Sequence, residues 1–118
     1  MGKEIITPDG KIFIAKDVIA KLAGIATTQC FGIIGMVSSR LSDGISDLLG
    51  KEALARGVEV VFKGEAMIIR VNVVVGYGTK ISLIANNVIE NVRYTVEKFT
   101  GLTVGNVEVG IRGVRVLD

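Results

Sequence analysis

The chain has 118 residues, enough for one domain with its own core, and its 49% hydrophobic and 22% charged residues are typical of a globular protein. Lys and Arg number 14 against 12 Asp and Glu, and the resulting net charge of +2 gives little attraction for nucleic acid or an anionic membrane. The chain has no His and one Cys, which excludes His-based catalysis, an internal disulfide and cysteine-rich metal sites, and favours a reducing, cytoplasmic location.

The first part of the chain predicts a strand, a helix and a second strand. Lys11–Ile14 is a short apolar run that follows an Asp-Gly pair, as strands often do. The next segment, KDVIAKLAGIATTQC, has apolar residues at helical spacing, with Asp17 as the candidate N-cap. We expect Gly32 to end this helix in a left-handed turn and Ile33–Ser38 to form a strand.

Residues 22–39 carry no charge, and this length raises the question of a membrane span. Three polar residues, Thr27, Thr28 and Gln29, interrupt the run. We therefore expect a soluble helix followed by a buried strand, with no direct membrane span and no signal peptide.

The middle of the chain predicts a β-hairpin. Gly57–Lys63 and Met67–Val75 alternate between apolar and polar residues, and Gly64-Glu65 between them suits a type II′ turn. The preceding segment, Ser42–Arg56, predicts one or two short helical turns or a partly mobile connector.

The last part predicts a long helix and a strand. Residues Ile81–Thr100 carry an apolar stripe with a period of 3.6 residues, formed by Ile81, Ala85, Val88, Val92, Val96 and Phe99. Thr79 or Ser82 is the candidate N-cap, and Gly101 ends the helix. Thr103–Val116 then predicts a strand.

This order of elements predicts one α+β domain over residues 1–118. The economical arrangement is a two-layer domain, with a mainly antiparallel sheet and two amphipathic helices on one face. The opposite face of the sheet then carries apolar and polar side chains that no helix covers. Such a surface is typical of an interaction site. The candidate residues are Ile68, Arg70, Asn72 and Val74 on the sheet, and Asn87, Asn91 and Tyr94 on the polar face of the second helix.

None of the short motifs predicts a catalytic, cofactor or metal site. Gly32–Gly35 has the GxxG spacing of an RNA-binding KH loop, but its middle residues are apolar, which favours helix termination and close packing. Cys30 lies at the end of an apolar helix with no His to act as its base, which favours a buried small hydrophobe over a nucleophile.

Three strings taken together, KDVIAKLAGIATTQCFGIIGM, VVVGYGTKIS and NVIENVRYTVEKFTGLTVGNVEVGIRGVRV, resemble the alkaline shock protein family, the envelope stress response proteins of Gram-positive bacteria. The resemblance covers roughly Gly10 to Val116, and is greatest for the short, housekeeping-type subgroup. It implies a small cytoplasmic α+β protein without established enzyme chemistry. Some members self-associate and are held near the membrane by an anchoring partner. The family has no catalytic motif to carry over to this chain.

We therefore expect a non-enzymatic interaction or scaffold protein linked to envelope or alkaline stress or to lipid homeostasis, acting by self-association or by docking on a membrane-anchored protein. Two alternatives stay open. The first is a nucleic-acid-binding module, against which the near-neutral charge and the lack of a basic stripe count. The second is a binder of small apolar ligands, since the abundant Val, Ile and Leu could line a pocket as well as a core.

Overall fold

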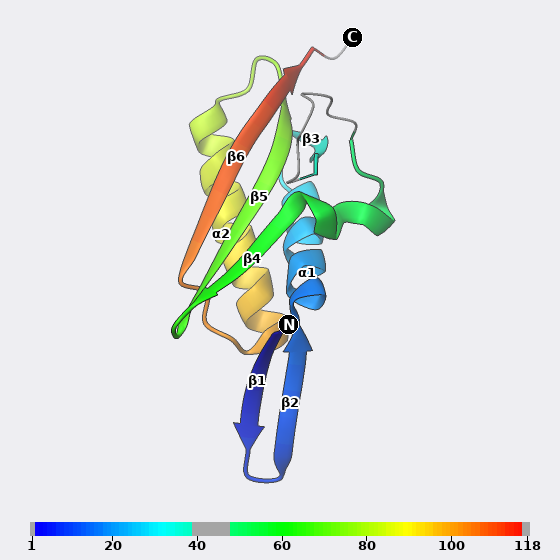
Figure 1. The fold of residues 1–118 in the computed structure, drawn as a ribbon. Helices are drawn as coiled ribbons and strands as arrows, with labels where there is room; N and C mark the ends of the chain where they lie inside the picture. Colours follow the sequence, from blue (N-terminus) through cyan, green and yellow to red (C-terminus); the bar gives the residue numbers. More distant parts are fainter. Residues whose placement is uncertain (1, 39–47, 117–118) are drawn as a thin grey trace.

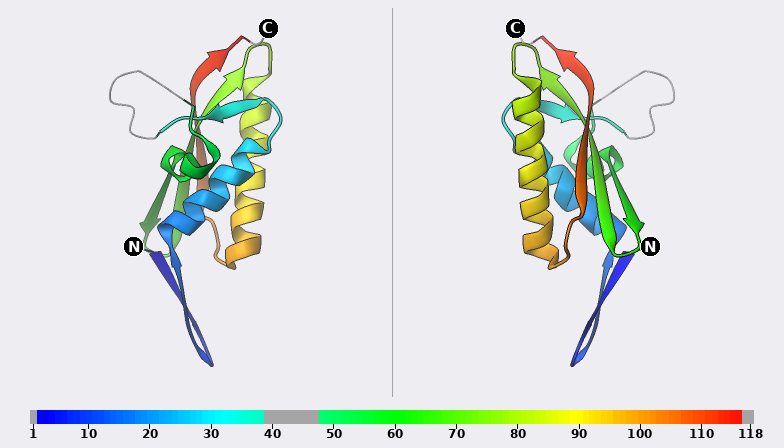
Figure 2. Two further views of the ribbon diagram at one scale, coloured as in Figure 1. Left: turned by 90° about the vertical axis from the view of Figure 1, so that its right-hand side faces the viewer. Right: turned by 90° about the vertical axis from the view of Figure 1, so that its left-hand side faces the viewer.

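Two helices pack on one face of a sheet and against each other, and a hairpin projects from one end of this body (Figure 1). The computed structural model describes residues 2–38 and 48–116. The helices are α1 (Lys16–Thr28) and α2 (Ile81–Thr100). The predicted α+β class is confirmed, with both helices on the same side of the sheet (Figure 2).

The central strand of the sheet is β5 (Ala66–Gly76). One of its edges pairs in parallel with β6 (Asn106–Arg115). Its other edge pairs antiparallel with two short strands. β4 (Val58–Lys63) pairs with the first part of β5 and β3 (Ile33–Met36) with the last part. The sheet is mainly antiparallel, as predicted, but β6 is parallel because the chain returns through α2 before it forms this strand.

The core lies between the sheet and the two helices. Alternate β5 residues, Ile69, Val71 and Val73, face the helices and are fully buried. The apolar face of α2 meets them with residues four positions apart, namely Ile84, Val88, Val92 and Val96. The apolar stripe predicted for this helix is therefore correct in the middle of α2. It is wrong at the two ends, where Ile81 is 44% and Phe99 68% exposed. Residues four positions apart are not exactly in line along a helix, so the buried stripe winds around α2. Such winding is expected where α2 crosses α1 at an angle.

The ends of α1 differ from the prediction. The N-cap is Ala15, which makes no side-chain capping bond, and Asp17 lies in the first turn instead. The helix ends at Gln29 in a right-handed conformation. Gly32 has a φ of +87° and adopts the left-handed conformation between the helix and β3. A Cβ at Gly32 would collide with Ile84 of α2, so both the torsion and the packing require glycine.

The predicted type II′ turn between β4 and β5 is confirmed, since Gly64 has a φ of +60° and Glu65 does not have a positive φ. Neither candidate caps α2. The N-cap is Lys80, which makes no side-chain capping bond, and the Thr79 hydroxyl donates to the Gly76 carbonyl at 2.6 Å. Gly101 ends α2 in the left-handed conformation, as predicted.

Replacing Gly101 with Ala is expected to lower the free energy of unfolding by about 1–2 kcal/mol, the cost of a left-handed backbone for a residue with a Cβ. A Cβ at this position meets no atom within 4 Å, so the backbone torsion of +76° is the whole cause. Gly101→Asn is the matched variant, because Asn tolerates this conformation better. Urea denaturation of both variants measures the difference, and equal stability of Gly101→Ala and the parent would contradict it.

The projecting hairpin consists of β1 (Gly2–Thr7) and β2 (Gly10–Ala15), and we call these residues the arm. Only the second strand was predicted. The expected helical turns of the connector are confirmed by a 3-10 helix at Lys51–Gly57. Residues 42–47, which were also included in that prediction, lie outside the described residues.

Candidate functional site

The arm is a two-stranded hairpin that carries three exposed large apolar side chains. It pairs in regular register, with Ile5 opposite Ile12 on one face and Glu4 opposite Phe13 on the other. Ile6 is 76%, Ile12 49% and Phe13 58% exposed, so both faces carry apolar side chains in contact with water. Figure 2 shows the arm leaving the body as a two-stranded ribbon with no further strand or helix on either face. A hairpin of two strands is marginally stable by itself.

A cavity of about 280 Å³ lies where the arm meets the body. Its walls come from three separate segments of the chain. Ile5 of the arm faces Phe62 and Met67 of the β4–β5 hairpin and Leu102 beyond α2, and Lys3, Glu4 and Glu65 add charges. The base of the arm thus forms part of a groove in the body.

The outer face of the sheet was predicted to present an apolar patch, and here the prediction is wrong for two residues. Val74 is 2% and Asn72 4% exposed, so neither offers its side chain to a partner. Val74 pairs with Gly35 of β3, and the side chain of Leu48 lies over Gly35. This segment covers the end of the outer face, which the sequence pattern of β5 alone could not reveal. Ile68 is half-buried.

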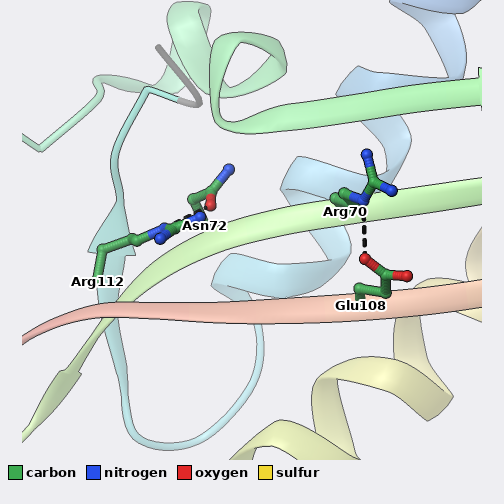
Figure 3. Close-up of polar contacts among 4 residues, drawn as sticks. All are labelled: Arg70, Asn72, Glu108 and Arg112. Atoms are coloured by element: carbon green, nitrogen blue, oxygen red, sulfur yellow. Dashed lines mark hydrogen bonds and ion pairs between the residues drawn. The ribbon is translucent and has the colours of Figure 1, made fainter. Parts of the chain in front are cut away.

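A polar network occupies the middle of that face (Figure 3). Arg70 donates through Nε to Oε1 of Glu108 at 2.7 Å, and this hydrogen bond and the charge of Glu108 raise the pKa of Arg70. Asn72 donates through Nδ2 to the Gly57 carbonyl at 3.3 Å and accepts from Nε of Arg112 at 2.9 Å. Asn72 is therefore a buried connector between β5, β6 and the 3-10 helix.

The predicted polar face of α2 is divided between packing and solvent. Asn87 is exposed, and Tyr94 is 61% exposed with Nζ of Lys98 5.5 Å from its ring centre. Asn91 instead donates through Nδ2 to the Ala26 carbonyl of α1 at 2.8 Å. The prediction of a surface role for Asn91 is corrected accordingly, because its amide holds the two helices together.

Cys30 has the environment of a packing residue. Its Sγ donates to the Ala26 carbonyl at 3.5 Å, and Asn91 approaches the sulfur at 3.7 Å. Burial raises the pKa of the thiol, while the hydrogen bond from Asn91 lowers it to a smaller extent. A raised pKa disfavours the thiolate, which is the reactive form. Within residues 2–38 and 48–116, no group of three or more His, Cys, Asp or Glu side chains is placed to hold a metal ion.

The arm is the feature that sequence reasoning missed. Ile6 was not a candidate, because no strand was predicted before Lys11. Phe13 lies within the predicted strand, but without a partner strand it was not recognised as part of an exposed surface. A signal was present in the sequence. Pro8-Asp9-Gly10 is a strong turn signal between two runs of strand-forming residues, and it predicts a hairpin once both flanks are considered.

A family model for the alkaline shock proteins, described as having a cell envelope-related function, matches residues 4–116. The chain belongs to this family. The resemblance to alkaline shock proteins seen in the sequence is thereby confirmed. Neither helix of this alkaline shock family chain, within its described part, combines the length and hydropathy needed to cross a membrane.

Curated relatives match along nearly the whole chain. The uncharacterized protein YloU of Bacillus subtilis is 44% identical over 119 residues, which is 100% of this chain and 99% of the relative. The uncharacterized protein Spy1614 of Streptococcus pyogenes is 37% identical over 118 residues, 99% and 98% of the two chains. The uncharacterized protein YqhY of Bacillus subtilis is 32% identical over 106 residues, 90% and 78%. No solved structure matches this member of the alkaline shock family.

Proposed function

We propose that this protein is a non-enzymatic interaction or scaffold protein with a cell-envelope-related role, and that it works by self-association or by docking on a membrane-anchored protein. The observation that carries the proposal is the arm. Its two strands expose Ile6, Ile12 and Phe13 to water and leave both outer backbone edges unpaired in the described structure. Apolar surface and open strand edges of this kind are stabilised by contact with another chain.

A non-enzymatic role is supported by the residue types. The sequence has no His, and the thiol of its single Cys has a raised pKa. Three ionisable groups on the outer sheet face make structural contacts, since Arg70 pairs with Glu108 and Arg112 donates to Asn72.

Neither alternative gains support from a specific contact. The cation of Arg70 on the sheet face is already balanced by Glu108, which weakens any attraction for phosphate. The GxxG glycines are packing positions, because a Cβ at Gly32 would meet Ile84 and one at Gly35 would meet Leu48. The cavity beside the arm mixes apolar walls with three charged residues, which suits a protein contact better than a purely apolar ligand.

The test is to replace Ile6 and Phe13 together with Lys. Both side chains lie on one face of the arm, so two added charges should oppose its burial against a partner. We expect the contact made by the arm to be lost, so that the assembly decreases in mass, while the stability of the fold changes by about 0.5 kcal/mol or less. Light scattering coupled to size-exclusion chromatography measures the mass, with refractive-index detection because the chain has two Tyr and no Trp.

The matched control is Tyr77→Lys, which removes a side chain that is 73% exposed at the opposite end of β5 from the arm. It should assemble as the parent does. A double Lys variant that assembles normally would refute the role of the arm. A parent that stays monomeric at every concentration would refute self-association, and the double variant would then be tested for loss of retention on isolated membranes.

A further inference from the structure

The second open surface is the free edge of β6. This strand has ten residues, and among the described residues it pairs with β5 alone. The opposite edge of the sheet is divided between β4 and β3, with six and four residues, and such short strands are a common protection against edge pairing. β6 contains neither Lys nor Pro, two residues that often protect a long edge. Its pairing with β5 is regular from Asn106 to Ile111 and shifts by one residue at Arg112, so the regular part of the edge is residues 106–111.

Charge along β6 is arranged in a self-complementary way. Glu108 and Arg112 lie on either side of Gly110 and point to the outer face of the sheet, where both are exposed (Figure 3). If two β6 strands pair antiparallel with Gly110 opposite Gly110, Glu108 of each copy faces Arg112 of the other. On the core-facing side, Val109 then lies opposite Ile111. Opposite charges and apolar residues as cross-strand neighbours stabilise a sheet.

Other registers lack this match. A shift by one residue sets the outer face of one copy against the core-facing side of the other. A shift of the pairing by two residues places Gly110 opposite Glu108 or Arg112 and leaves the charges without partners. The next shift places Glu108 opposite Glu108 or Arg112 opposite Arg112, which is repulsive. The charge pattern therefore selects one register.

Each of the two charged groups makes one hydrogen bond to a residue of β5 and keeps further polar atoms unused. The bond that Arg70 donates uses Oε1 of Glu108, and the bond that Arg112 donates to Asn72 uses its Nε. The second carboxylate oxygen and the terminal guanidinium nitrogens remain for a partner. Gly110 lies between them, in a space where a Cβ would come within 3.0 Å of Oδ1 of Asn72.

We propose that β6 pairs edge to edge with β6 of a second copy about a two-fold axis at Gly110, which joins the two sheets into one. The proposal rests on the proposed self-association and names a surface for it that is separate from the arm. A two-fold contact of this kind closes on itself and gives a dimer.

The decisive experiment uses Glu108→Lys and Arg112→Glu as separate variants. Each places like charges opposite one another at both ends of the pairing, so each should dimerise about tenfold or more weakly than the parent. In a mixture, the lysine introduced at position 108 of one variant faces the glutamate introduced at position 112 of the other, and the native Arg112 and Glu108 face each other. We expect the equimolar mixture to form heterodimers, seen by native mass spectrometry when one variant is labelled with ¹⁵N.

Arg70→Gln is the matched control, because it removes the ion pair with Glu108 without altering the edge. It should still dimerise. A monomeric parent, unchanged dimerisation of the two single variants, or no heterodimer in the mixture would each overturn the proposal. The Ile6 and Phe13 double Lys variant separates the two surfaces. If it keeps a dimer, of twice the 12.5 kDa chain mass, that dimer should be lost on adding Glu108→Lys, whereas a monomer would refute the β6 contact and support the arm.

Discussion

Replacing Val74 with Lys is expected to lower the free energy of unfolding by about 3–5 kcal/mol, because an unpaired charge would be buried. Val74 is 2% exposed and pairs with Gly35 of β3 and Gly113 of β6. The sequence alone predicts the opposite result, namely an exposed position where Lys would break association and leave the fold intact. The experiment therefore separates the structure from the sequence pattern.

The matched variant is Ile68→Lys, on the same face of the same strand but at the half-buried end. This variant should lower the free energy of unfolding clearly less than Val74→Lys, because the long Lys side chain can reach water with its charged end. Circular dichroism in urea measures both, since a shift of the midpoint without a change of slope reports stability. Equal losses for the two variants would contradict the covered state of Val74.

Replacing Ile69 with Ala is expected to lower the free energy of unfolding by about 2–5 kcal/mol, which is a large part of the stability of a domain of this size. Ile69 is fully buried between the sheet and the helices, and its removal leaves a cavity in close-packed surroundings. The neighbouring Ile68 points to the other face and is half-buried. Ile68→Ala should therefore cost much less, although the same atoms are removed.

Urea denaturation of the two Ala variants at one temperature provides the comparison. Because the pair differs by one position along β5, its difference in stability reports directly which face of the strand meets the core. A larger loss for Ile68→Ala than for Ile69→Ala would contradict the register of β5.

Elements whose signals are local could be predicted from the sequence. The bounds of α2 were correct because the apolar period and the left-handed Gly101 both lie within the segment. The β4–β5 hairpin was correct because Gly64 satisfies the torsion of its own turn. The arm had a local signal as well, in Pro8-Asp9-Gly10, but it requires both flanking runs to be considered as strands.

The candidate surface depended on contacts between distant segments, and this explains its errors. Asn91 has the spacing of a solvent-facing residue on α2, yet the carbonyl that it meets belongs to Ala26 of α1. Asn72 is buried by Gly57 and Arg112, which are 15 and 40 residues away. A sequence pattern assigns polar residues to the surface as long as such partners are unknown. Whether a polar group can be buried depends on its hydrogen bonds.

The parallel pairing of β5 with β6 also fixes an order of events during folding. β4 and β5 are joined by a two-residue turn and can zip together locally, whereas the contact between Arg70 and Glu108 closes a separation of 38 residues. During synthesis, β6 leaves the ribosome after β5 and α2 have already emerged. Until then, the longest strand of the sheet has one edge without a partner, and the nascent chain is most open to wrong pairing in that interval.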